Sequence, residues 1–331
     1  MHRTALSFAA AATLLMAGTA IAAPNVVAST KPIHSLVAAV MGDTGAPILL
    51  VKGAASPHDY ALRPSDAAAL ESADIVFWTG PGFEIFLDDA LKTLSSNAEI
   101  IELSKADGIK LLPVREGGAF EAHDHAHDHE GHDHDHDDHS HDDDHAHDEH
   151  THDDDGHDHH EASDLHFWLD PENAALMVTD IAAELSAADP DNAAIYAANA
   201  EATRAELSVL TTEIAGILEP VAAKPFVVFH DAYQYFEARF GLTLAGTVTV
   251  SPEAMPGAGR IDELRAKVAE LGATCVFAEP NFQPAIVNTI VEGTEAKVGT
   301  LDPEGSALSE GPGLYAELLR TLATNIADCL N

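Results

Sequence analysis

The stretch Asp164–Pro171 reads Asp-Leu-His-Phe-Trp-Leu-Asp-Pro and places one histidine, His166, among apolar neighbours. Two more histidines have comparably defined surroundings: His58 lies in Ser-Pro-His-Asp-Tyr, and His230 lies in Val-Val-Phe-His-Asp-Ala-Tyr. Imidazole nitrogens are preferred ligands of zinc and related transition metals. We therefore interpret these three side chains, which come from distant parts of the chain, as a closed metal site, with zinc as the first candidate.

The segment before this stretch is rich in histidines and acids. Residues 123–160 contain 16 histidines, 16 acidic residues and no Lys or Arg. Without apolar periodicity such a segment cannot offset its ordering entropy, so we expect a disordered loop over residues 121–163. It would bind the same metal weakly at many sites, and protonation of its histidines would also make it sensitive to acid. These auxiliary low-affinity ligands are His123, His125, His127, His129, His132, His134, His136, His139, His141, His145, His147, His150, His152, His157, His159 and His160.

The composition limits the class of partner. The chain has 331 residues, of which 46% are hydrophobic, and its formal net charge is −39. A chain of this length usually forms more than one core, so two lobes are expected. The negative charge disfavours nucleic acid and anionic membrane surfaces and favours cations. A folded, cation-binding protein without nucleic-acid partners follows from these totals.

The N-terminus has the features of an export signal. A short basic region at His2 and Arg3 precedes an apolar run over residues 5–16, and Ala20-Ile-Ala22 offers small residues to a signal peptidase. We expect residues 1–22 to be cleaved and the mature chain to be soluble and periplasmic, because no later stretch is long and apolar enough to span a bilayer. The alternative is an uncleaved anchor, for which the apolar run is too short.

The chain has two cysteines, Cys275 and Cys329. In an oxidising compartment an even pair is best interpreted as a disulfide, which would close a loop of about 55 residues and contribute up to about 4 kcal/mol. A pair of thiolate metal ligands is the alternative, but the spacing is not that of a CxxC motif. The disulfide would tie the last helix to the C-terminal lobe.

Apolar runs alternate with helical stretches in both halves of the chain. This alternation predicts an α/β fold with two lobes, each a parallel sheet flanked by helices, over residues 23–188 and 220–331. Residues 189–219 predict one long linking helix, because Pro190 suits its first position and no Pro and no Gly other than Gly216 follows, with a pair of bundled helices as the alternative. The expected strands are 25–30, 48–51, 74–80, 225–229, 244–248, 275–278 and 296–301.

Polar side chains follow several of these strands. Ligands of α/β folds bind at the carboxyl ends of the strands, and His58, His230 and Asp302 all lie just after a predicted strand. Taken alone, His58 would more often be a solvated turn residue, and Asp302 could simply cap a turn with Pro303 and Gly305. Their common placement in two lobes predicts a site in the cleft between them.

Seven pieces of the mature chain together carry a family resemblance. The chain resembles the ZnuA-like zinc-binding proteins of bacterial ABC importers, which belong to a group of metal receptors with a rigid interlobe helix. The matching pieces are Lys31–Leu36, Ser56–Asp66, Asp74–Trp78, His166–Pro171, Phe229–Tyr233, Glu279–Phe282 and Thr300–Gly305.

The resemblance implies a ligand set. His58, His166 and His230 fall at the positions of the three ligand histidines, and Asp302 at that of the acidic residue that completes the site or lies near it. Manganese-selective relatives carry a carboxylate at the third position, so His230 favours zinc. Some members have a glutamate before the first ligand, where this chain has Pro57, which leaves the fourth position open between Asp302 and water. We expect a monomeric receptor that delivers zinc to the membrane permease of an ABC importer.

Two other functions fit parts of the sequence. Three histidines and a water also describe hydrolytic zinc enzymes, but no HExxH or nucleophile-elbow motif is present. Asp231 and Glu279 could act as bases, yet such carboxylates more often orient metal ligands. The histidine-rich loop alone would suffice for zinc storage or buffering, and a receptor for manganese, nickel or copper is a further alternative. We expect a receptor and not an enzyme.

Overall fold

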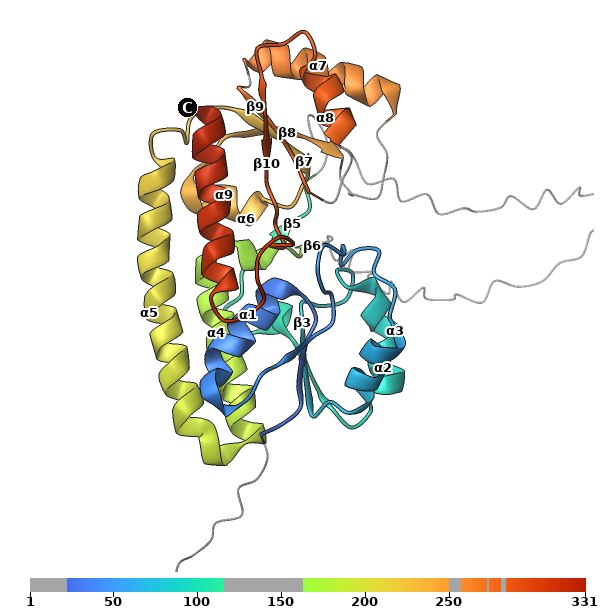
Figure 1. Ribbon diagram of the computed structural model, residues 1–331. Coiled ribbons are helices and arrows are strands. Elements are labelled where there is room, and N and C mark those ends of the chain that lie inside the picture. Colours follow the sequence, from blue (N-terminus) through green and yellow to red (C-terminus); the bar gives the residue numbers. More distant parts are fainter. Residues whose placement is uncertain (1–22, 116–162, 250–256, 273, 281–283) are drawn as a thin grey trace, which may run out of the picture.

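The computed structural model describes residues 23–115, 163–249, 257–272, 274–280 and 284–331, which form two lobes beside a set of long helices (Figure 1). Each lobe contains a four-stranded parallel sheet flanked by helices, so the predicted fold class is confirmed. The predicted signal segment and most of the histidine-rich segment lie outside the described residues. Within those residues, no helix combines the length and apolar character that a bilayer crossing requires.

The N-terminal sheet has the strand order β2-β1-β3-β4. Its strand β3 (Ile75–Trp78) is buried at every position, as expected of a parallel strand that is covered on both faces. Val76 and Trp78 pack with two short helices on one face, whereas Ile75 and Phe77 join the main core on the other. The remaining elements of this lobe are β1 (Val26–Ala28), α1 (Lys31–Met41), β2 (Ile48–Leu49), α2 (Pro64–Glu71), α3 (Asp88–Leu94) and β4 (Glu99–Glu102).

The C-terminal sheet repeats this plan with the strand order β10-β9-β7-β8. In β7 (Phe226–His230), Val227 and Phe229 pack in a core of this lobe alone, and Phe226 and Val228 join the main core. The predicted disulfide between Cys275 and Cys329 is present and joins β9 to the last helix. The other elements are α6 (Gln234–Phe240), β8 (Leu244–Thr249), α7 (Ala258–Leu271), β9 (Cys275–Ala278), α8 (Pro284–Val291) and β10 (Lys297–Thr300).

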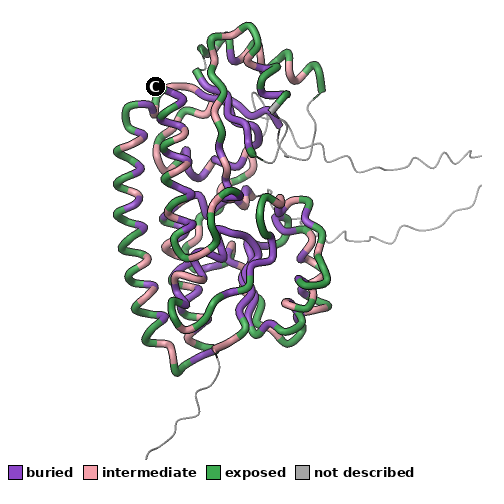
Figure 2. Tube along the Cα trace, in the orientation of Figure 1, coloured by how far each residue is buried: buried purple, intermediate pink, exposed green. Residues whose placement is uncertain are grey.

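Long helices connect the lobes. The linking helix α5 (Ala193–Leu218) has 26 residues, so it is about 39 Å long, and it begins after a short 3-10 helix over Pro190–Asn192 and not at residue 189. Figure 2 shows that it is buried along one side only, where it packs against α4 (Pro171–Ala188) and α9 (Leu314–Leu330). One continuous hydrophobic core contains residues of both sheets, so the lobes share packing beyond a single connecting helix.

A small antiparallel pair lies between the lobes. β5 (Leu112–Pro113) pairs with β6 (Ser163–Asp164), so Ser163, which we counted within the histidine-rich loop, lies in a strand. Tyr235 of α6 fixes this pair, because its hydroxyl accepts a hydrogen bond from the amide of Leu112 and donates one to the carbonyl of Asp164. The described residues on either side of the gap at 116–162 are therefore joined to each other and to the C-terminal lobe.

Candidate metal centre

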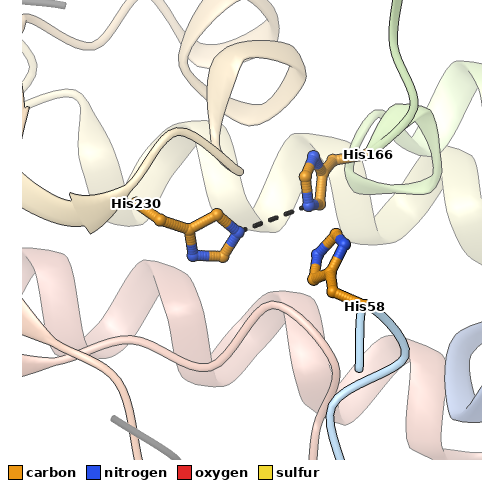
Figure 3. Close-up of side chains that lie close together, drawn as sticks. All are labelled: His58, His166 and His230. Atoms are coloured by element: carbon orange, nitrogen blue, oxygen red, sulfur yellow. Dashed lines mark hydrogen bonds between the residues drawn. The ribbon is translucent and has the colours of Figure 1, made fainter. Parts of the chain in front are cut away.

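The three predicted ligand histidines come together between the lobes (Figure 3). His58 lies on the loop after β2, His230 is the last residue of β7, and His166 directly precedes the 3-10 helix η4 (Phe167–Leu169). One nitrogen of each imidazole lies within 4.8 Å of the corresponding nitrogens of the other two. Within the described ranges, no other three His, Cys, Asp or Glu side chains meet in this way.

The spacing of the imidazoles fits one small ion. The Nε2 atoms of His166 and His230 are 3.4 Å apart, and two nitrogens bound to tetrahedral zinc at about 2.0–2.1 Å would be separated by about 3.3 Å. The ring centroid of His58 lies 5.6 Å from that of His166 and 5.9 Å from that of His230. The three rings therefore surround a common point.

The surroundings of the site hold His58 in the uncharged form that binds metal. The residues His166 and His230 are 8% and 2% exposed, and His58 is partly buried. Burial, followed by repulsion from His166 and His230, lowers the pKa of His58 to about 2. At neutral pH this imidazole is unprotonated, and its lone pair is available to a cation.

Two carboxylates orient two of the imidazoles. Nδ1 of His166 is 2.8 Å from Oδ1 of Asp164, and Nδ1 of His230 is 2.6 Å from Oε1 of Glu279. Such contacts fix the ring and its tautomer so that Nε2 faces the metal. The orienting role expected for Glu279 is therefore seen, whereas Asp231 pairs with Arg115 instead. Asp164 lies two residues before His166, and nothing in its local sequence indicates this orienting role.

Aromatic rings form one wall of the site. The ring of Phe83 lies 4.7 Å from that of His58 and 5.2 Å from that of His166, measured between centroids. Trp168 packs against both Phe83 and His166 and donates a hydrogen bond from Nε1 to the carbonyl of Pro303. No local sequence signal identifies Phe83 as part of the site, because its contact with the histidines depends on how the loops fold over the sheet.

The imidazoles line a cavity of about 20 Å³, which has room for an ion or one water molecule. Asp302 lies beside this cavity, and each of its oxygens accepts hydrogen bonds within its own turn. Oδ1 accepts a hydrogen bond from the amide of Glu304 at 3.1 Å, and Oδ2 accepts from the amide and hydroxyl of Ser306, each at 2.7 Å. The structure does not bring Asp302 into the cluster of three, so its role as a ligand stays a prediction. The other lining residues are Ser56, Pro57, Glu279, Pro280, Pro303 and Glu304.

Several carboxyl groups cluster near the cavity. Burial, together with the nearby carboxylates of Asp302, Glu84 and Glu279, raises the pKa of Glu304 well above its usual range. Burial likewise raises the pKa of Glu84, although Ser29 and the amide of Thr79 donate hydrogen bonds to it. A cation in the cavity would reduce the repulsion among these groups.

Lys31 fixes the turn that carries Asp302 and Glu304. Its ammonium group is buried and donates hydrogen bonds to the carbonyls of Gly305, Ser306 and Leu308, at 2.7 to 3.2 Å. Because Lys31 begins α1 in the N-terminal lobe and the turn follows β10 in the C-terminal lobe, this contact joins the lobes next to the site.

The model of the ZnuA family, described as zinc-uptake complex component A, periplasmic, matches residues 26–329. The chain belongs to this family. A high-affinity zinc uptake system protein ZnuA of Brucella suis is 54% identical over 307 residues, which are 93% of this chain and 92% of that protein. The protein of the same description from Paracoccus denitrificans is 44% identical over 93% of this chain and 92% of its own length.

Solved structures agree with the family assignment. A crystal structure of ZnuA superposes with a TM-score of 0.72 at 26% identity and covers 93% of this chain and 100% of its own. A second structure, described as a 138–173 ZnuA deletion mutant plus zinc bound, gives 0.71 at 27% identity and covers 93% and 98%. The resemblance inferred from the sequence is thus confirmed.

Proposed function

We propose that this chain is a periplasmic zinc receptor, which captures Zn²⁺ between its lobes and delivers it to the permease of an ABC importer. The observation that carries this proposal is the meeting of His58, His166 and His230 around a cavity the size of one ion. Membership of a family described as a periplasmic zinc-uptake component supports the same function. Zinc is therefore the cargo and not a resident catalytic cofactor.

The ligand set suits zinc. Three imidazoles and one oxygen donor give a tetrahedral site, and imidazole binds the borderline ion Zn²⁺ better than hard cations. The oxygen would come from Asp302, from another carboxylate of the cavity or from water. Manganese, which prefers oxygen ligands, is disfavoured by three nitrogens.

Binding without catalysis fits the site better than hydrolysis. A hydrolytic enzyme requires room for an organic substrate beside the metal and a base that is free to take a proton. The cavity of about 20 Å³ offers no such room, and Glu279 is hydrogen-bonded to His230. Measured hydrolytic turnover by the zinc-loaded protein, abolished in His166→Ala, would contradict this part of the proposal.

The arrangement of the lobes favours small movements. We divide the mature chain into an N-terminal lobe over residues 23–188, a linking helix over 189–219 and a C-terminal lobe over 220–331. The shared core and the buried contacts of Lys31 with the opposite lobe support a site that opens by small shifts and not by wide hinge closure. A large lobe rotation between metal-free and zinc-loaded crystals would contradict it.

The remaining parts of the proposal concern segments outside the described residues. Residues 1–22 act as a cleaved signal, and the histidine-rich segment 123–160 raises the local zinc concentration near the cleft. The mature protein acts as a monomer. For one solved relative, the description of a 138–173 deletion mutant with zinc bound is consistent with separate roles for a cleft site and an inserted segment.

Competitive zinc titration tests the function. The chain is compared with His166→Ala and with a deletion of residues 123–160, and His34→Gln serves as the control histidine because His34 lies on α1 outside the cluster. We expect one tight site in the chain, the deletion and the control, and loss of that site in His166→Ala. If deletion of residues 123–160 abolished all tight zinc binding, the result would instead support a storage protein.

A further inference from the structure

The segment that carries His166 is held at both ends by helix α6 of the C-terminal lobe. At its start, the hydroxyl of Tyr235 donates a hydrogen bond to the carbonyl of Asp164. At its end, the guanidinium group of Arg239 forms a two-pronged ion pair with Asp170, in which both nitrogen–oxygen distances are 2.7 Å. Arg239 follows Tyr235 by four positions, so both side chains project from the same face of the helix. One face of α6 thus contacts the chain on either side of His166.

The middle of the segment is bonded to the same lobe. The indole of Trp168 donates a hydrogen bond to the carbonyl of Pro303 at 3.1 Å, and the carbonyl of Trp168 accepts one from the hydroxyl of Tyr315 at 2.6 Å. From the N-terminal lobe, the ring of Phe83 packs against the rings of His166 and Trp168. Ring packing is less directional than a hydrogen bond, so we expect the segment to follow the C-terminal lobe when the two lobes shift.

His230 is tied to the same short helix. It ends β7, and α6 begins four residues later at Gln234. The Nε2 atoms of His166 and His230 are 3.4 Å apart, and a dashed line joins the two rings in Figure 3. His58 instead stands on the loop after β2, which belongs to the other sheet. A shift between the lobes would therefore part His58 from the other two imidazoles and leave the spacing of that pair unchanged.

We propose that α6 is the positioning element for His166, which it keeps beside His230 through Tyr235 and Arg239, so that these two ligands move as one pair with the C-terminal lobe. This inference rests on the proposed zinc receptor function and concerns how its site is held. Tyr235 and Arg239 are positioning residues, because they act through the segment around His166 and are not part of the histidine cluster. An ion that leaves the cleft loses His58 before it loses the pair.

Zinc titration of the full chain, in competition with a chelator, tests the two anchors. Arg239→Gln breaks the ion pair at the end of the segment, and Tyr235→Phe removes the hydroxyl that bonds to its start. Loss of a group that orients a metal ligand lowers affinity about 10- to 100-fold, and these anchors act one contact further out, so we expect a loss of about 10-fold in each variant. The control is Arg320→Gln, which breaks an exposed two-pronged pair with Glu213 between α9 and α5 and should leave zinc affinity unchanged.

Two double variants separate positioning from general stability. In His58→Ala only the pair remains to bind the ion, so adding Arg239→Gln should again lower zinc affinity about 10-fold. In His166→Ala the ligand that α6 positions is gone, so adding Arg239→Gln should change the residual affinity by less than about 2-fold. An equal further loss in both backgrounds overturns the inference, because Arg239 would then act on the fold as a whole. Unchanged affinity in either Arg239→Gln or Tyr235→Phe alone overturns it too.

The melting temperature of each metal-free variant shows whether it is folded. If Arg239→Gln does not fold, Arg239→Lys takes its place, since lysine keeps the charge but cannot form a two-pronged pair, and its zinc affinity should also fall. If the unsubstituted chain shows no single tight site, the zinc receptor function fails, and this inference fails with it. A tight site that keeps its full affinity in the α6 variants overturns this inference alone.

Discussion

The two sides of the metal site are built differently. His166 and His230 are almost fully buried, and a carboxylate bonds to Nδ1 of each ring. His58 stands on an irregular loop and is partly exposed, and the ring of Phe83 packs against it at a centroid distance of 4.7 Å. Comparison of the two sides suggests a fixed pair of ligands that is present before metal binding and a third ligand that closes the site over the ion.

Alanine substitutions at His230 and His58 test this difference most strongly. His230→Ala removes one of the fixed pair of ligands itself, so we expect zinc affinity to fall by more than the roughly 100-fold that marks loss of an orienting group. His58→Ala should cost less, because the pair stays intact. Chelator competition measures both. A loss in His58→Ala that equals or exceeds the loss in His230→Ala would remove the distinction between the two sides.

Substitution of Glu279 measures how much the orientation of the pair contributes. Glu279→Ala leaves His230 free to rotate, and we expect zinc affinity to fall by about 10- to 100-fold. Glu279→Gln, which retains a hydrogen-bond acceptor, is the matched control and should lose less. If zinc binding is equal in Glu279→Ala and the unsubstituted chain, packing alone orients His230.

The smallest expected effect concerns pH and the His58 side. The pKa of the His58 imidazole is about 2 in the folded metal-free protein, against 6.5 for an unperturbed histidine. The unfolded chain therefore binds an extra proton between these values, so this residue lowers the stability of the folded state as the pH falls from about 6.5 toward about 2. Thermal unfolding of the metal-free protein at pH 7.5 and pH 5 should show a smaller loss of melting temperature in His58→Asn. An equal loss would mean that His58 titrates normally.

The sequence predicted the parts of the site that lie on strong elements. β7 is Phe-Val-Val-Phe-His, so its apolar residues identified a strand and its last residue a position at the strand end. The strand over Ile75–Trp78 was recognisable for the same reason. His166 could be predicted as a ligand because it is a single histidine among the apolar residues that follow the histidine-rich segment.

Other features could not be predicted because they depend on tertiary contacts. Two-residue strands such as Leu112–Pro113 carry no periodic signal, and their pairing depends on Tyr235 of the other lobe. The proximity of Phe83 to the imidazoles has no counterpart in the local sequence. For Asp302 the sequence left a turn cap and a ligand as alternatives, and the hydrogen bonds to Ser306 now show that it does act as a cap.

The short pair formed by β5 and β6 has a consequence for how the protein can change. Pro113 lies opposite Ser163, so the described residues on either side of the gap at 116–162 are fixed next to each other. The number of residues inserted there can grow or shrink without altering the distance between the two attachment points. A change in the length or histidine content of the chain between them would therefore leave His166, three residues after Ser163, in the same place relative to this pair.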